Sequence, residues 1–67
     1  MKEVLKISNL NTNDDVLALR ESISNNEGVV ACEVNLTKKE INIVFDDQVI
    51  TIDKIILSLE KLGYIAN

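Results

Sequence analysis

The chain has 67 residues and a mass of 7.5 kDa, which allows one small hydrophobic core and excludes multidomain machinery. Eleven acidic residues outweigh seven basic ones, so the attraction that drives nucleic-acid binding is missing and we expect no nucleic-acid partner. Histidine and tryptophan are absent, which removes the commonest general base and the strongest stacking side chain. We therefore expect a protein that is not an enzyme.

The single cysteine, Cys32, has no partner for an internal disulfide, which fits a reducing compartment. The N-terminal segment lacks the apolar run of a secretion signal. No apolar stretch approaches the roughly 20 residues that a bilayer-spanning helix needs. These features predict a cytoplasmic protein with no membrane insertion.

Residues 2–8 alternate between apolar and polar side chains, which predicts a half-buried strand with Leu5 and Ile7 on its inner face. A polar loop follows over residues 9–13. Apolar residues then recur at helical spacing up to Asn25, and Thr12 or Asn13 is suited to cap this helix. The residues that form its apolar face are Val16, Leu19 and Ile23.

Residues 30–45 have the pattern of a β-hairpin with a turn at Thr37–Lys39. The first strand is expected to bury Val30, Cys32, Val34 and Leu36, and the second Ile41, Ile43 and Phe45. A second helix is predicted after Thr51, with Gly63 just past its end. Residues 64–66 leave room for a short final strand.

The order of these elements is β-α-β-β-α-β, with no proline-rich or serine-rich linker between them. This order predicts an α+β ferredoxin-like sandwich over residues 1–67, a single domain in which two helices cover one face of a four-stranded antiparallel sheet. Right-handed crossovers give the strand order 4-1-3-2. The loop over residues 9–13, the hairpin turn and residues 61–64 are then expected to meet at one end of the domain.

Four short segments carry a resemblance to a known family: Leu5-Lys6-Ile7, Glu27-Gly28-Val29, Cys32-Glu33-Val34-Asn35-Leu36 and Leu62-Gly63-Tyr64. With this spacing the chain resembles the heavy-metal-associated domain family of bacterial copper chaperones and metal-transporting ATPase N-terminal domains. The resemblance covers the whole chain and implies the same ferredoxin-like fold.

The family's metal motif is G-M-x-C-x-x-C, between the first strand and the first helix. The corresponding window here is Asn9-Leu10-Asn11-Thr12-Asn13-Asp14-Asp15. Leu10 stands at the methionine position, and the resemblance implies that it packs under the loop. Thr12 and Asp15 stand at the two cysteine positions, so the soft sulfur donors that Cu(I) prefers are replaced by hard oxygen donors. We expect weak binding of copper or zinc at most, and no confident metal ligand.

The acidic pair Asp14-Asp15 suggests a site for Mg²⁺ or Ca²⁺, but the loop supplies too few oxygen ligands. Helix capping is the favoured interpretation, because acids in a first turn stabilise the helix dipole. Lys61 and Tyr64 are expected beside the loop, as the resemblance implies for residues that adjust the family's metal site. One hypothesis is that the Lys61 ammonium supplies the charge that Asp15 lacks without a metal ion.

The leading functional prediction is a docking module related to metal trafficking, with a degenerate thiolate site. Its expected partner is a metal-transporting ATPase or another protein, bound through the loop end and the first helix, and a monomer is favoured over a dimer. The alternative is a small-ligand regulatory or dimerisation module of the same topology. An acylphosphatase-like enzyme fits poorly, because the chain's Arg20 is predicted on the outer face of the first helix.

Overall fold

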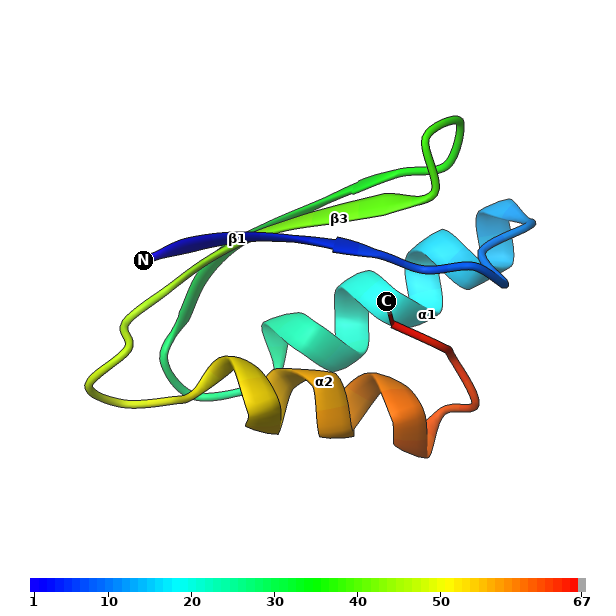
Figure 1. Cartoon of the computed structure of the whole chain (residues 1–67). Helices are drawn as coiled ribbons and strands as arrows, with labels where there is room; N and C mark the ends of the chain where they lie inside the picture. The colour runs from blue at the N-terminus through cyan, green and yellow to red at the C-terminus, as the bar shows by residue number, and fades with distance from the viewer. Residues whose placement is uncertain (67) are drawn as a thin grey trace.

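The computed structural model describes residues 1–66, which fold into a three-stranded sheet and two helices. The sheet forms one layer, and both helices lie beneath it (Figure 1). In chain order, the elements are β1 (Lys2–Lys6), α1 (Asn13–Ser24), β2 (Val29–Asn35), β3 (Glu40–Phe45) and α2 (Ile52–Lys61).

The strands are antiparallel in the order β1-β3-β2, as predicted for these three. The predicted four-stranded sheet is wrong within residues 1–66, where the sheet has three strands. The predicted fourth strand over residues 64–66 is reduced to an isolated bridge between Ile7 and Ala66. The Asn9 side chain binds the Ile65 N–H, which would otherwise be free to pair with the backbone of Ser8. Its amide nitrogen donates to Gly63 O at 2.9 Å, and its Oδ1 accepts from Ile65 N at 2.9 Å.

Both helices begin where the sequence predicts. Thr12 caps α1 and Thr51 caps α2, each with a side-chain oxygen that accepts from a backbone N–H in the first turn. Gly63 follows the end of α2 with a φ of +92°, the left-handed conformation that glycine adopts most easily. This turn directs the chain back toward β1.

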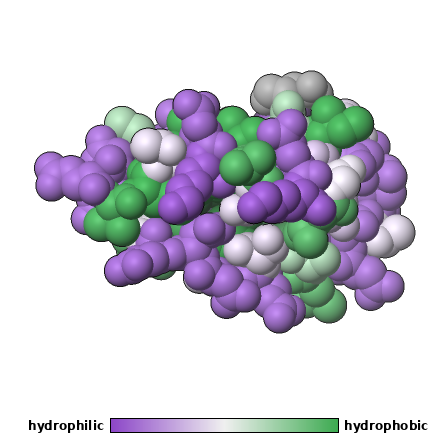
Figure 2. All heavy atoms as spheres, turned by 90° about the horizontal axis from the view of Figure 1, so that it is seen from below, coloured by the Kyte–Doolittle hydropathy of each residue, from purple (hydrophilic) through white to green (hydrophobic). Residues whose placement is uncertain are grey.

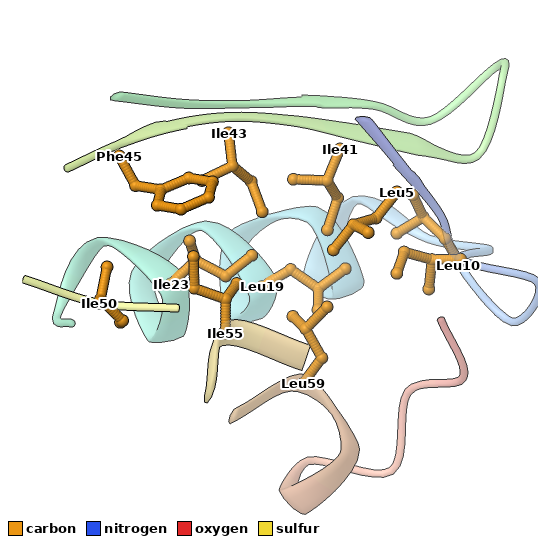
Figure 3. Packing of buried hydrophobic residues seen from close by; sticks show 11 residues of the cluster. Leu5, Leu10, Leu19, Ile23, Ile41, Ile43, Phe45, Ile50, Ile55 and Leu59 are labelled. Carbon is orange, nitrogen blue, oxygen red and sulfur yellow. The ribbon is translucent and has the colours of Figure 1, made fainter. Parts of the chain in front are cut away.

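The core lies between the sheet and the helices and is almost entirely aliphatic (Figure 3). Strand β3 contributes three fully buried side chains at alternate positions, as predicted. The helices contribute residues at the predicted helical spacing. The buried residues are Leu5, Ile7, Leu10, Leu19, Ile23, Ile41, Ile43, Phe45, Ile50, Ile55 and Leu59.

Strand β2 departs from the predicted alternation. The pairing register with β3 shifts between Val29 and Ala31, so that Val30 bulges outward and is 73% exposed. The prediction that Val30 lies on the apolar face with Cys32 is therefore wrong, and Val29 packs against the core in its place. A prediction from strict alternation misses such a bulge, because one extra residue in the strand moves the residues on its N-terminal side to the opposite face of the sheet.

The helix side of the molecule is mostly hydrophilic, with apolar atoms exposed between the polar side chains (Figure 2). Leu17, Leu57 and Leu62 are each about half exposed there, at 59%, 50% and 49%. Within residues 1–66, neither helix has the length and apolar character needed to cross a membrane.

We expect Ile43→Ala to lower the free energy of unfolding by about 2–5 kcal/mol, because it leaves a cavity at a fully buried position of the core. Val30→Ala is the matched control on the neighbouring strand and should change it by less than about 0.5 kcal/mol. Urea unfolding followed by circular dichroism measures both. Equal losses would contradict the outward bulge of Val30.

Candidate functional site

The loop between β1 and α1 lies where three segments meet, as the predicted topology requires. Ile7 N donates to Lys39 O at 2.8 Å, which places the hairpin turn beside the start of the loop. Ser8 N donates to Ile65 O at 3.2 Å, which places the C-terminal segment on its other side. Leu10 is fully buried and packs under the loop, as the resemblance implied.

The two residues at the cysteine positions of the motif bind to each other. Thr12 Oγ1 accepts a hydrogen bond from Asp15 N at 3.1 Å, and Asp15 Oδ2 accepts one from Thr12 N at 3.0 Å. These reciprocal bonds form a capping box at the start of α1. Helix capping, the favoured interpretation of Asp15, is confirmed.

The Asp15 carboxylate accepts two further hydrogen bonds. Asn11 N donates to Oδ2 at 3.0 Å, and the Tyr64 hydroxyl donates to Oδ1 at 2.6 Å. Both carboxylate oxygens therefore accept hydrogen bonds from the protein. The bond from Tyr64, with those from the Asn11 and Thr12 amides, lowers the pKa of Asp15 to about 2, since each stabilises the charged form. The same bond raises the pKa of Tyr64 to about 12, because the neighbouring carboxylate opposes a phenolate.

Two asparagines complete the network around the loop. The Asn9 side chain binds the backbone of Gly63 and Ile65. The backbone carbonyl of Asn9 accepts a hydrogen bond from Asn11 Nδ2 at 3.2 Å. Asn11 Oδ1 in turn accepts from Lys39 Nζ at 3.3 Å, across the gap to the hairpin turn. The loop is thus fastened by hydrogen bonds to the hairpin turn and to the segment after α2.

Lys61 does not take part in this network. It is exposed in the last turn of α2, and the ion pair found within residues 1–66 joins Lys6 and Glu40 at 3.4 Å. The structure therefore gives no support to the hypothesis that Lys61 supplies the positive charge for Asp15. A neutral phenol and two backbone amides stabilise this carboxylate instead.

Cys32 lies on β2, half-buried, and packs against the core rather than at the loop. Burial raises the pKa of its thiol, and the charge of Arg20 offsets part of that rise. In residues 1–66, histidine, cysteine and carboxylate side chains nowhere form a group of three that is placed to hold a metal ion.

The donor set of the loop does not fit a soft metal ion. Cu(I) requires polarisable sulfur ligands, whereas the two motif positions offer a hydroxyl and a carboxylate. The oxygen atoms of both side chains already accept hydrogen bonds, and an incoming ion would have to compete with these donors. The exposed Asp14 carboxylate is the remaining acid of the loop, and one carboxylate makes a poor Mg²⁺ or Ca²⁺ site.

A small α+β domain with two helices under an antiparallel sheet and a loop joining β1 to α1 has the architecture of the metallochaperones. The heavy-metal-associated domain family matches residues 4–64, and the chain belongs to this family. No curated protein matches the chain by sequence.

Solved structures share the fold at low sequence identity. The CopZ metallochaperone superposes with a TM-score of 0.96 at 21% identity, with 100% of both chains covered. Oxidised MerP from Ralstonia metallidurans CH34 gives 0.95 at 19%, covering 100% of this chain and 93% of that one. A copper-binding domain from HMA7, a P-type ATPase, gives 0.94 at 20%, covering 98% and 89%.

Sequence reasoning placed Tyr64 near the loop but overlooked its bond to Asp15 and the role of Asn9. The two partners of that bond are 49 residues apart, and no local pattern signals such a contact. For Asn9 a signal was available. A side chain with a donor and an acceptor at the motif's glycine position is suited to bind a neighbouring backbone.

We expect Tyr64→Phe to raise the pKa of Asp15 from about 2 toward the ordinary value, because the strongest of its hydrogen bonds is lost. A carboxylate whose pKa is lower in the folded state than in the unfolded state stabilises the folded state at pH values above the unfolded pKa. This stabilisation is lost as the pH falls from about 4 to about 2. Carboxyl carbon NMR titration measures the pKa, and urea unfolding across this pH range measures the change in stability. If the pKa of Asp15 stays near 2 in Tyr64→Phe, the phenol is not what stabilises the charge.

Proposed function

We propose that this heavy-metal-associated domain is a protein-docking module related to metal trafficking, and that it works without holding a soft metal ion in its loop. The observation that carries the proposal is the capping box between Thr12 and Asp15, the two positions at which the family motif has cysteine. With the bond from Tyr64, it keeps the loop closed by protein groups alone. The docking surface is then independent of metal supply.

The surface beside the loop has the composition of a docking site. Leu17 is 59% exposed on α1, and the exposed acids Asp14 and Glu21 lie three and four residues away, on the same helix face. An apolar centre flanked by carboxylates suits a partner with an apolar patch and basic residues around it. The net charge of −4 supports attraction to such a partner over long range.

The expected partner is a metal-transporting ATPase or another protein of the same trafficking route. In this proposal residues 1–67 act as one domain and as a monomer, with no catalytic step and no nucleic-acid partner, and the cytoplasmic location stays a prediction. The alternative of a small-ligand regulatory module is not favoured, because the family match and the structural neighbours concern metal trafficking.

A Cu(I) competition experiment tests the loop. Against a chromogenic Cu(I) chelator, we expect the native chain to withdraw no copper and the backbone amides of residues 9–16 to keep their NMR positions. The matched control is Thr12→Cys with Asp15→Cys, which restores two thiolates at the motif positions and should withdraw about one copper ion per chain. Stoichiometric copper binding at the loop of the native chain would refute the proposal.

Docking is tested with the metal-binding domain of a copper-transporting ATPase, added to the isotopically labelled chain without metal. We expect shifts of the amide signals around Leu17, and Asp14→Lys with Glu21→Lys should weaken binding about tenfold, because the helix loses two attractive charges. Asp53→Lys with Glu60→Lys, both exposed on α2, is the charge-matched control and should weaken it far less. Binding that requires added copper would contradict a metal-independent surface.

A further inference from the structure

Strand β2 is an outer strand of the sheet, with β3 on one side and no further strand on the other within residues 1–66. Met1 and Ala66 both lie at the opposite edge, along β1. The bulge at Val30 interrupts only the start of β2, because Ala31–Asn35 keep a regular register with β3. A bulge protects an edge only where it lies, so residues 31–35 are open to an added strand.

The direction of the backbone groups of β2 follows from the register of the sheet. The backbone of Phe45 binds the residue that precedes β1, so the even-numbered residues of β3 face β2. Their partners on β2 are the odd-numbered residues of the range 31–35. The N–H and C=O groups of Cys32 and Val34 therefore point away from the sheet, and among residues 1–66 they have no backbone partner. These four groups form a template for an added strand.

Charged side chains of opposite sign flank this edge on its two faces. Helix α1 packs under β2; burial raises the pKa of the Cys32 thiol, and the charge of Arg20 offsets part of that rise, so Arg20 lies near Cys32 on the inner face. Leu17, three residues earlier, is exposed on the same side of α1. Glu33 is exposed on the outer face, and within residues 1–66 neither Arg20 nor Glu33 forms an ion pair. An added strand would therefore meet a base on one face of the sheet and an acid on the other.

A second copy of the chain fits this edge poorly. Antiparallel pairing that uses Cys32 and Val34 of both copies is centred on Glu33, and it places the two Glu33 carboxylates opposite each other. Like charges directly opposite each other are destabilising. The inner-face residues that a second β2 would bring, Cys32 and Val34, also supply no acid for Arg20. A strand of different sequence is therefore the better occupant.

We infer that the outer edge of β2 is a second binding site, which takes an extended segment of a partner protein as an added antiparallel strand. Three consecutive residues of that segment follow the order aliphatic, basic, acidic. The aliphatic residue lies opposite Val34, on the side where Leu17 is exposed. The basic residue lies opposite Glu33 on the outer face. The acidic residue lies opposite Cys32 on the inner face, where it meets the charge of Arg20.

The test uses the peptide acetyl-Gly-Thr-Ile-Lys-Glu-Thr-Gly-amide and the isotopically labelled 67-residue chain, with a reductant present. We expect saturable shifts of the Cys32 and Val34 amide signals, with the signals of residues 2–6 unchanged. A control peptide in which the lysine and the glutamate are exchanged has the same composition and net charge and should bind about fivefold more weakly. Arg20→Glu with Glu33→Lys should reverse this preference, because both flanking charges change sign.

Backbone pairing is tested on the peptide, which leaves the fold of the chain unchanged. N-methylation of the isoleucine removes an N–H that would donate to Val34 O, and N-methylation of the lysine, whose N–H would point away from β2, is the matched control. We expect the first to weaken binding at least tenfold and the second to weaken it far less. Absent binding, equal effects of the two methyl groups, equal binding of the two charge arrangements, or a dimer of the chain by light scattering would overturn the inference. Failure here leaves the ATPase-domain experiment unaffected, because that experiment depends on Asp14 and Glu21.

Discussion

The hydrogen bond from the Tyr64 hydroxyl to Asp15 Oδ1, 2.6 Å long, is the interaction on which the candidate site depends. It joins the first turn of α1 to the segment after α2, and so holds these two segments together beside the loop. A hydrogen bond to an ionised acceptor is stronger than one between neutral groups, and this carboxylate also receives two backbone N–H groups. The charge of Asp15 is therefore stabilised without any cation.

The same hydrogen bonds explain how the loop between β1 and α1 keeps its shape without the two cysteine thiolates of the family motif. In a loop with two thiolates, a bound cation would neutralise charge and draw the motif positions together. Here Thr12 and Asp15 are drawn together by a capping box, which needs no ion and no oxidation state. The closed shape of the loop therefore depends on protein groups alone.

Much of the fold was predictable because it depends on local patterns. The apolar spacing of α2, the capping threonines Thr12 and Thr51, and the alternation in β3 are each contained within a few residues. The bulge at Val30 was not predictable, since it depends on how β2 pairs with β3, where Val29 lies opposite Phe45. The reduction of the predicted fourth strand to one bridge and the Tyr64 bond were missed for the same reason, because both depend on contacts between residues more than 45 positions apart.

Asn9 connects the loop with the edge of the sheet. At the motif's first position a glycine has no side chain, whereas the Asn9 amide binds both Gly63 O and Ile65 N. These bonds hold Tyr64 between them and so place its hydroxyl within reach of Asp15. They also occupy the Ile65 N–H, which would otherwise face the backbone of Ser8, so that this segment pairs with Ile7 only as an isolated bridge. One substitution in the motif therefore helps to close the loop and to shorten the pairing of the segment after α2.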